Sequence, residues 1–420
     1  MPTLPEVLAR LDRLVDWERR DRAGMRVDVE PARDLLARLG RPELRFHAVH
    51  VAGTKGKGSV CALIDAGLRA AGRRTGRYAS PHVERVHERI LLDGHEIDDA
   101  RLTQVLDRAL NAQAQARMEG TAGRGASWFD VWTAAAFVAF ADYGCDWAVV
   151  ECGIGGRLDS TNAMDGEIAV LTNVDLEHTA LLGNTHAAIA RDKLGIVKPG
   201  RPLVTGVPPG SEAGAVVEEV AAERGSAVTF ALGGPDASLR QSNLAIANAV
   251  LALAKVAPLD EAAARAVQLP GRMEIFEPSA ATQGVTVVLD GAHVPSNLRA
   301  VLQDLRREAR FRAPCVVVIG LGRDKDAAAL MRELTALGPL RIVATAYRHG
   351  LPPHEPESLA SVASDQGALS AHAIDRPLDA LRQALAEAAT LGDGAWVLVT
   401  GSLHVVGEVR GPLRATLSPA

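Results

Sequence analysis

The sequence predicts an α/β fold, with a doubly wound parallel sheet in a first domain and a smaller, Rossmann-like α/β domain after it. Short apolar segments of strand type alternate with Ala-rich helical segments along the 420 residues, which is the pattern of parallel sheets covered by helices. Several apolar segments end in an acidic or hydroxyl residue, where open α/β sheets bind ligands. A chain of this length also exceeds one ordinary core, so we expect about two or three domains.

The first domain is predicted to span residues 1–275. Its helices and strands follow from apolar periodicity and from turn residues. In chain order they are helices at 4–20 and 30–39, a strand at 45–50, a helix at 60–70, a strand at 72–79, a hairpin at 86–97 with Asp93-Gly94 at its turn, helices at 98–118 and 128–143, strands at 146–151 and 168–173, a helix that carries Lys193, a strand at 202–205 and a helix at 241–256.

The second domain is predicted to span residues 276–420. A turn-rich stretch at 269–274 precedes it, and a second strand–helix series begins at 285–290. Further strands are expected at 315–319, 341–344 and 396–399.

Composition narrows the classes of function. A formal net charge of −5 and an aromatic content of 4 % argue against a nucleic-acid-binding surface. Four scattered cysteines, without a CxxC pair, are expected to be buried and reduced. Neither a signal peptide nor an apolar run near the ~20 residues of a membrane span is visible. We therefore expect a cytoplasmic protein without nucleic-acid or membrane partners.

The most informative stretch is 51–59, Val-Ala-Gly-Thr-Lys-Gly-Lys-Gly-Ser, which follows a predicted strand and opens a predicted helix. Glycines let backbone N–H groups approach an anion, and a helix start adds unpaired donors and a positive dipole end. Lys57 would reach the β- and γ-phosphates of a nucleotide, and Ser59 would offer a hydroxyl near Mg²⁺. The stretch departs from the general P-loop in two ways: its first glycine lies too close to the Gly-Lys pair, and Gly58 stands where Ser or Thr normally follows the lysine. A glycine-rich turn without a ligand is the alternative.

Other side chains could carry chemistry, and each has a structural alternative. Glu151 ends a buried strand and could bind Mg²⁺ or cap the next turn. His178 follows another strand, although a lone histidine is more often structural than a Mg²⁺ ligand. Asp290 and His293 close a further strand, where they could contact ribose and phosphate or form a polar turn. Lys193 lies on a helix and would by default be a solvated charge.

Sequence motifs at 53–59, 78–82, 88–90, 151–162, 175–179, 192–198, 271–274, 290–293 and 401–408 follow one another along the chain. In this order they resemble the dihydrofolate synthase/folylpolyglutamate synthase family of the Mur-ligase superfamily. The resemblance covers residues 5–410. It also accounts for the shortened phosphate loop, because the loop of this family contains Gly-Lys-Gly-Ser.

The resemblance implies an ATP-dependent amide ligase. Such an enzyme phosphorylates a carboxylate of dihydropteroate or of a folate to an acyl phosphate, which the amine of L-glutamate then attacks. Two anions must meet in line, so cations and positioned donors should carry most of the catalysis. ATP would be held by both domains, and closure would exclude water from the acyl phosphate. The resemblance also suggests a monomer that acts on small molecules.

The resemblance further implies roles for single residues. The nucleotide contacts would be Gly53, Thr54, Gly56, Lys57, Gly58, Ser59, Asn248, Arg272 and Asp290. The ligands of two Mg²⁺ ions would be Ser59, Ser80, Glu151, His178 and Lys193, with Lys193 carbamylated so that it presents an anionic oxygen. The catalytic residues would be Lys57, Lys193 and His293, of which His293 would face the transferred phosphate.

The chain departs from the family pattern at three positions. Asp130 stands where the family has Glu, Val294 where Asn often follows the Asp-Gly-Ala-His tetrad, and His404 where the family has Tyr. Asp130 and His404 lie near the expected surroundings of the pterin and of glutamate, so they bear on substrate choice.

Two other functions compete with this interpretation. A related Mur-type ligase could act on a UDP-linked precursor or on another acid, but residues 1–50 are too few for a uridine-binding domain before the phosphate loop. A non-catalytic ATP-binding paralogue is the second rival. The presence of Lys57, Glu151, His178, Lys193 and Asp290 speaks against this rival. A measurement of catalytic turnover distinguishes it from a ligase.

Overall fold

The computed structural model describes residues 2–17, 28–234, 236–336, 338, 340–348 and 350–415. It forms two compact units, of which the first reaches Val267 and the second begins at Gln268. The sequence placed this boundary after residue 275. The difference arises because strand β9 (Glu274–Phe276) pairs antiparallel with strand β10 (Thr286–Leu289), so the stretch before β10 belongs to the second sheet.

The first unit alternates short strands with helices, as its sequence predicts. Its strands are β1 (His47–Ala52), β2 (Thr75–Tyr78), β3 (Ile90–Leu92), β4 (His95–Glu96), β5 (Trp147–Glu151), β6 (Ile168–Leu171), β7 (Leu203–Thr205) and β8 (Val228–Phe230). Its helices are α1 (Leu4–Leu11), α2 (Glu30–Arg38), α3 (Lys57–Ala70), α4 (Asp99–Glu119), α5 (Trp128–Tyr143), α6 (Thr179–Leu182), α7 (His186–Lys193), α8 (Glu212–Arg224), α9 (Leu239–Leu253) and α10 (Glu261–Ala266).

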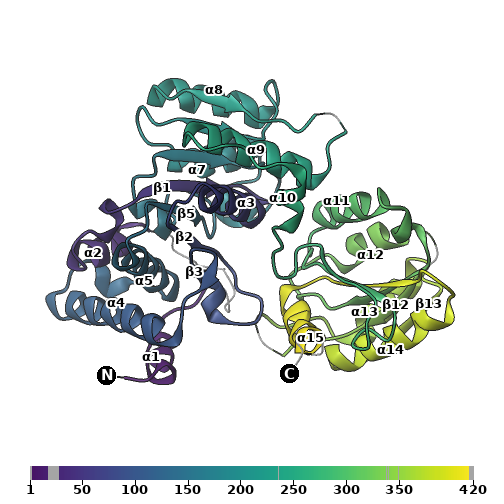
Figure 1. Cartoon of the computed structure of the whole chain (residues 1–420). Helices are drawn as coiled ribbons and strands as arrows, with labels where there is room; N and C mark the ends of the chain where they lie inside the picture. The colour runs from purple at the N-terminus through teal and green to yellow at the C-terminus, as the bar shows by residue number, and fades with distance from the viewer. Residues whose placement is uncertain are drawn as a thin grey trace. The chain divides into compact units, whose positions relative to one another are not determined.

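Within the described part of the first unit, the sheet has eight strands in the order β4-β3-β2-β5-β1-β6-β7-β8. The six strands β2, β5, β1, β6, β7 and β8, which are neighbours in this order, run parallel to one another. Strands β3 and β4 form an antiparallel hairpin at the edge next to β2. The chain winds outward in both directions from β1, because β5 lies on one side of it and β6 on the other. Figure 1 labels β1, β5, β2 and β3 of this sheet. The doubly wound fold is therefore confirmed, and the loop after β1 lies at the switch point where such sheets bind ligands.

Helices cover both faces of this sheet. Alternate residues of a strand point to opposite faces, so Val49 and Val149 pack with α3 and α9, whereas Ala48 and Val150 pack with α4 and α5. The helix α5 is apolar on most sides because it lies between the sheet, α2 and α4. Gly76 in β2 permits this packing, since a Cβ there would lie 2.3 Å from the ring of Phe140.

One predicted helix of the first unit is too long. The helix expected at 4–20 ends at Leu11, and residues 18–20 lie outside the described residues. The chain leaves the helix because the carbonyl oxygen of Val15 accepts the N–H of Trp128 at the start of α5. A contact to a distant helix thus overrides the local apolar pattern of Leu8, Leu11 and Leu14.

The second unit contains, among the residues described, a six-stranded sheet in the order β13-β12-β11-β14-β10-β9. All pairs are parallel apart from β9 with β10, and the four strands expected from the sequence are confirmed as β10, β11, β12 and β14. The remaining elements are β11 (Cys315–Ile319), β12 (Arg341–Ala344), β13 (Ser370–Ala373), β14 (Trp396–Thr400), α11 (Pro295–Arg306), α12 (Ala327–Thr335), α13 (Pro356–Asp365), α14 (Pro377–Thr390) and α15 (Leu403–Ala415).

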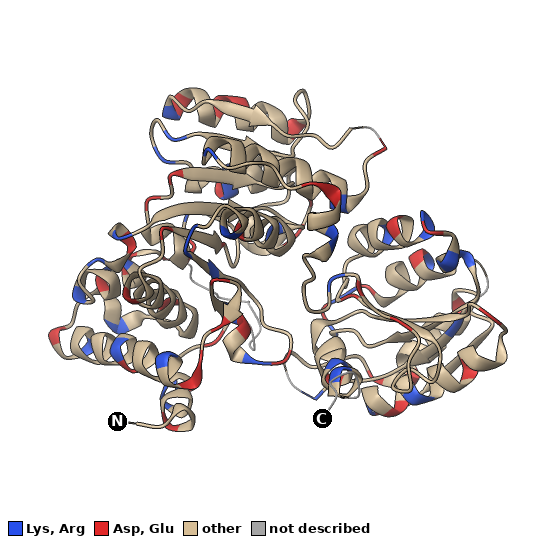
Figure 2. Cartoon of the chain, in the orientation of Figure 1, with Lys and Arg blue, Asp and Glu red and all other residues tan. Residues whose placement is uncertain are grey.

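The surfaces of the two units carry mixed charges. Lys and Arg are interspersed with Asp and Glu along helices such as α8 (Figure 2), and many form ion pairs, for example Arg191 with Glu219. In the part of the chain that the structure describes, no helix combines the length and apolarity needed to cross a bilayer. The four cysteines are buried and form no disulfide, as the sequence predicts.

A buried histidine lies in the middle of the central strand β1. The Nε2 atom of His50 is 2.8 Å from Oγ1 of Thr161 and 3.1 Å from Sγ of Cys152. Burial, together with the charge of Lys198, lowers the pKa of His50 to about 3 from its ordinary value of 6.5. The unfolded chain therefore binds a proton on this imidazole across a pH range in which the folded chain does not.

This difference predicts acid sensitivity of the first unit. As the pH falls from 6.5 towards 3, His50 should remove up to about 1.4 kcal/mol of the free energy of unfolding per pH unit. The variant His50→Gln should therefore lose about 2 kcal/mol less than the wild type between pH 7 and pH 5. Urea unfolding at the two pH values measures this difference. Equal losses in both proteins would contradict the assignment.

Candidate active site

The loop after β1 adopts a backbone that favours glycine at two positions. Gly53 has a φ of +150°, and a Cβ built there would lie 1.9 Å from Oγ1 of Thr172. Gly56 has a φ of +75° and is the N-cap of α3, so the helix begins directly at the end of the loop. The first N–H groups of a helix have no partner inside the helix, and this start is therefore suited to bind an anion.

Two lysines converge on the first residue of this phosphate loop. The Nζ atom of Lys57 donates to the carbonyl oxygen of Gly53 at 3.1 Å, and Nζ of Lys193, the last residue of α7, donates to the same oxygen at 3.0 Å. Lys193 is 4 % exposed, so it is not the solvated charge of the structural alternative. Burial, reinforced by the charge of Lys57, lowers the pKa of Lys193 to about 8.

The carboxyl ends of β2 and β5 bring Ser80 and Glu151 together. The N–H of Ser80 donates to Oε2 of the buried Glu151 at 3.3 Å. On the other side of β1, His178 follows β6 and is the N-cap of α6, with a φ of +52°. Its Nε2 atom lies 3.9 Å from Oε1 of Glu177. The strand order therefore places the phosphate loop between the loop that follows Glu151 and the loop that carries His178.

These donors fit a magnesium ion that also binds nucleotide phosphates. Mg²⁺ commonly takes one or two protein oxygens and completes its shell with phosphate and water. The hydroxyls of Ser59 and Ser80 and the carboxylate of Glu151 are donors of this type. Among the residues that the structure describes, no group of three or more His, Cys, Asp and Glu side chains is arranged to hold a metal. A metal here would therefore depend on phosphate ligands.

Sequence reasoning gave no role to Asp159, which organises the loop after β5. Its Oδ2 atom accepts the N–H groups of Gly153 and Ile154, both at 3.0 Å, and its Oδ1 atom accepts the N–H of Thr161 at 3.0 Å. Burial raises the pKa of Asp159, against the effect of these hydrogen bonds. The tripeptide Asp-Ser-Thr is a recognisable signal for such local bonds. Asp159 thereby fixes the glycine-rich turn that follows Glu151.

The side chain of Asn248 forms its hydrogen bonds with Leu259 and not with the phosphate loop. Its Nδ2 atom donates to the carbonyl oxygen of Leu259 at 3.0 Å, and its Oδ1 atom accepts the N–H of Leu259 at 2.9 Å. Another residue of α9, Asn243, lies beside the loop, since a Cβ at Gly56 would be 2.7 Å from its Oδ1 atom. Residues five apart on a helix point about 140° apart, so the two asparagines cannot share this position. The structure thus places Asn243, rather than Asn248, beside the loop.

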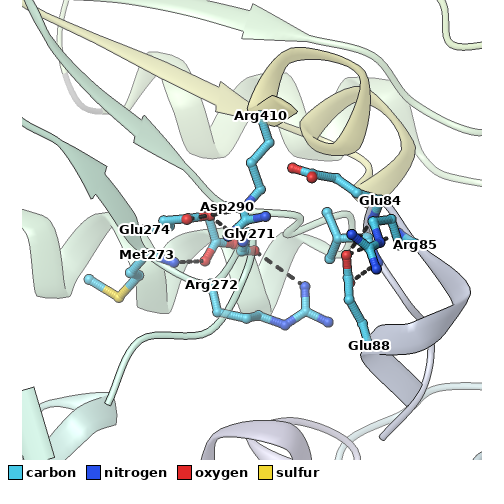
Figure 3. A network of polar contacts seen from close by, with 10 residues as sticks. Glu84, Arg85, Glu88, Gly271, Arg272, Met273, Glu274, Asp290 and Arg410 are labelled. Carbon is cyan, nitrogen blue, oxygen red and sulfur yellow. Dashed lines mark hydrogen bonds and ion pairs between the residues drawn. The ribbon is translucent and has the colours of Figure 1, made fainter. Parts of the chain in front are cut away.

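In the second unit, Asp290 follows β10 and holds two backbone N–H groups. Its Oδ2 atom accepts from Met273 at 2.9 Å and its Oδ1 atom accepts from Ala292 at 2.8 Å (Figure 3 draws the first). Burial raises the pKa of Asp290, and the charge of Arg272 opposes this shift. The Nδ1 atom of His293 lies 2.9 Å from the carbonyl oxygen of Gly291. A carbonyl can only accept, so Nδ1 carries the proton and the ring orientation is fixed.

A buried ion pair supports the turn that carries Arg272. The Nε atom of Arg410, on α15, lies 3.0 and 2.7 Å from the two carboxylate oxygens of Glu274 (Figure 3). Oε2 of Glu274 also accepts the N–H of Gly271 at 2.9 Å. Removal of one partner would leave a buried charge uncompensated. Sequence reasoning missed this pair, because its members lie 136 residues apart in the chain.

A carboxylate also shapes the segment after Ser80 in the first unit. The side chain of Glu88 accepts the N–H groups of Val83 at 2.7 Å and of Glu84 and Arg85 at 3.0 Å (Figure 3). These three bonds fold the chain between β2 and β3 into a compact turn. The motif Glu88-Arg89-Ile90, one of those that carry the family resemblance, therefore begins with a residue whose side chain binds backbone N–H groups.

The structure shows the surroundings of the three residues that depart from the family pattern. Asp130 accepts from the N–H of Ser127 at 2.7 Å and from the hydroxyl of Ser160 at 2.6 Å, so it ties the start of α5 to the loop after β5. Val294 occupies the N-cap position of α11, but its apolar side chain makes no capping hydrogen bond to the first turn of the helix. The ring of His404 lies beside that of Tyr347, with the ring centroids 5.0 Å apart and the ring planes tilted by 35°.

Comparisons of the sequence with known proteins agree over both units. Residues 271–403 match the family described as Mur ligase, glutamate ligase domain. The chain is 33 % identical to a dihydrofolate synthase/folylpolyglutamate synthase of Mycobacterium tuberculosis, over 90 % of this chain and 88 % of that protein. It is 32 % identical to a folylpolyglutamate synthase of Lacticaseibacillus casei, over 90 % of this chain and 92 % of that protein.

Solved structures resemble the whole chain as well. Folylpolyglutamate synthase of M. tuberculosis, complexed with ADP and AMPPCP, matches with a TM-score of 0.83 and 29 % identity over 98 % of each chain. Escherichia coli FolC in complex with DHPP and ADP matches with a TM-score of 0.81 and 26 % identity over 99 % of each chain. A bifunctional folylpolyglutamate synthase/dihydrofolate synthase with Mn, AMPPNP and L-glutamate bound matches with a TM-score of 0.78 and 28 % identity, over 99 % of this chain and 98 % of that chain.

Proposed function

The chain belongs to the dihydrofolate synthase/folylpolyglutamate synthase family, and we propose that it is an ATP-dependent ligase that joins L-glutamate to dihydropteroate and to folates. The observation that carries most weight is the convergence of Lys57 and Lys193 on the carbonyl oxygen of Gly53. Lys57 supplies a fixed cation for a reaction in which a carboxylate and a γ-phosphate must meet, and Lys193 brings a buried amine to the same point of the phosphate loop.

The proposed reaction has two steps. A carboxylate oxygen of the pterin substrate attacks the γ-phosphorus of ATP, and ADP leaves. The amine of glutamate then attacks the carbonyl carbon of the acyl phosphate and loses a proton, and phosphate leaves with one oxygen of the original carboxylate. The N–H groups at the start of α3 and the ammonium of Lys57 would orient the phosphates and stabilise the charge on the transferred group.

Ser59, Ser80, Glu151 and His178 are the residues that we propose to hold Mg²⁺ beside the phosphates. The ion would supply charge neutralisation of the β- and γ-phosphates when bound. The contact between the N–H of Ser80 and the carboxylate of Glu151 supports this proposal, because it brings two of the donors to adjacent strand ends. Gly53, Thr54, Gly56 and Gly58 would complete the cradle with their backbone.

We propose that Lys193 becomes carbamylated and serves a second Mg²⁺. In this step the neutral amine attacks CO₂, an N–C bond forms and a proton is released, which leaves an anionic carbamate. The pKa of about 8 supports the proposal, because the neutral amine is the reactive form. The change of sign would also remove the repulsion between Lys193 and Lys57, which share the carbonyl oxygen of Gly53.

In the second unit, we propose that Arg272 and Asp290 contact ATP and that His293 faces the transferred phosphate. The fixed ring of His293 and the buried carboxylate of Asp290 support these roles, since groups held in place need little reorganisation in the reaction. The role of Asn248 as an ATP contact remains a prediction, with its amide bound to Leu259. We also propose that the protein is a monomer and that it acts in the cytoplasm. Its four cysteines are buried and free, which suits a reducing compartment.

The experiment that tests the function is ADP release by the purified protein. Dihydropteroate or tetrahydrofolate, added together with L-glutamate, should stimulate it, and mass spectrometry should find a product one glutamate heavier. No stimulation by either pair would reject the proposal. Stimulation by a different acid alone would favour the rival Mur-type ligase, whereas nucleotide binding without turnover on any acid would favour the non-catalytic paralogue.

A further inference from the structure

A set of contacts around Lys55 has no part in the roles assigned above. Lys55 is the residue of the phosphate loop before Gly56, and its Nζ atom donates to Oδ2 of Asp175 at 2.7 Å. Asp175 lies in the segment between β6 and α6. The pair therefore joins the phosphate loop to the segment that leads to His178.

The backbone of Lys55 is held from both sides by the same segment. Its N–H donates to Oδ1 of Asn173 at 2.9 Å, and its carbonyl oxygen accepts from Nδ2 of Asn173 at 3.0 Å. The carbonyl oxygen also accepts from the hydroxyl of Thr172 at 2.6 Å. One asparagine amide thus satisfies both polar groups of Lys55, as a neighbouring strand would do.

The preceding residue is joined to the segment in a similar way. The N–H of Thr54 donates to the carbonyl oxygen of Asn173 at 3.1 Å, and its hydroxyl accepts the N–H of Asp175 at 3.1 Å. Thr54 and Lys55 are therefore held through both backbone and side chains. A loop fixed in this way loses little conformational freedom when it binds a ligand.

We propose that Asn173 and Asp175 are positioning residues, which hold the phosphate loop in its nucleotide-binding shape through Lys55 and couple it to the segment that carries His178. Neither residue needs to touch the nucleotide for this role. The inference rests on the proposed function only in taking the ligand of the loop to be a nucleotide. Because Asp175 and His178 belong to one short segment, a shift of the loop also shifts a proposed metal ligand.

A different role for Lys55 leads to the opposite result in one variant. If Lys55 were a third cation for the phosphates, Asp175 would compete with the nucleotide for it, and Asp175→Asn would tighten nucleotide binding. If Asp175 positions the loop, the same variant weakens binding. The sign of the change therefore separates the two roles.

The test is the affinity of the purified full-length chain for AMPPNP with Mg²⁺, measured by isothermal titration calorimetry. Lys55→Met and Asp175→Asn should each weaken binding by about fivefold, which is the scale of a partly exposed ion pair. The double variant Lys55→Met/Asp175→Asn should be no weaker than either single variant, because both remove one interaction. Asn173→Asp should weaken binding by roughly tenfold, since it keeps one bond to Lys55 and loses the other.

Asp107→Asn is the matched control, because Asp107 forms a comparable ion pair with Arg10 at 2.5 Å between α1 and α4, and it should leave the affinity unchanged. Thermal unfolding of each variant establishes that the chain is folded. Unchanged or tighter binding by Asp175→Asn would overturn the proposal, as would additive losses in the double variant. A wild-type chain that binds AMPPNP without ligase activity would reject the proposed function and leave this test intact.

Discussion

Replacing Lys57 by alanine is expected to lower glutamate-dependent ADP formation by at least roughly a thousandfold. The ammonium of Lys57 lies 3.1 Å from the carbonyl oxygen of Gly53, at the start of the phosphate loop. Without it, the charge that collects on the transferred phosphoryl group would lose a fixed cation. Alanine is a good helix former at the first residue of α3, so the fold should be retained. Steady-state ADP release measures the effect.

The control for this variant is Lys255→Ala, which removes an exposed lysine after α9 in the same unit. It should turn over at the wild-type rate. If Lys57→Ala keeps more than about a tenth of the wild-type turnover, which corresponds to a loss below about 1.4 kcal/mol, the assignment of the phosphate-facing cation is wrong. Nucleotide binding should be measured beside turnover, so that a loss of affinity is separated from a loss of rate.

The second large effect is expected for Lys193→Ala, which should lower turnover by roughly a hundredfold or more. Bicarbonate should not restore activity, because alanine offers no amine for a carbamate. Lys193→Arg should not restore it either, since a guanidinium stays charged and cannot form the same carbamate. Near-normal turnover of Lys193→Ala would remove the carbamate from the account.

The carbamate also predicts a dependence on pH that does not require activity. Burial lowers the pKa of Lys193 to about 8, so about a tenth of its amine is neutral at pH 7 and about nine tenths at pH 9. An ordinary lysine is neutral in less than about 0.1 % of molecules at pH 7. At a fixed concentration of dissolved CO₂, the carbamate signal in ¹³C NMR should therefore rise from pH 7 to pH 9 and be absent in Lys193→Ala. A signal of the same size in this variant would assign the carbamate to another amine.

The sequence predicts correctly those helices, strands and turns whose bounds are determined by residues close to them in the chain. The helix expected at 128–143 is confirmed with the same bounds, and in the structure Ser127 caps its start and Gly144 ends it. The hairpin at Asp93-Gly94 and the parallel strands followed from equally local signals. The helix at 4–20 was too long, because its end depends on a contact between Val15 and the distant Trp128.

In the candidate site as well, some residues are visible as sequence motifs, whereas contacts between residues far apart in the chain are not. The glycines at 53 and 56 and the acid at the end of β5 are visible as motifs. The contact of Lys193 with Gly53 joins residues 140 positions apart, and only the family resemblance singled this lysine out. The choice between Asn243 and Asn248 depends on which face of α9 meets the loop, and sequence spacing alone does not fix it. The contacts of Asn173 with Lys55 were missed because an asparagine after a strand is commonly a turn residue.

The central claim is that ATP activates the carboxylate as an acyl phosphate before glutamate attacks. The most direct measurement uses dihydropteroate labelled with ¹⁸O in its carboxylate, followed by mass spectrometry of the phosphate released with glutamate and ATP. The account predicts one ¹⁸O atom in each phosphate, because the carboxylate oxygen that attacks phosphorus leaves with it. Released phosphate without ¹⁸O, formed together with the glutamate adduct, would contradict it.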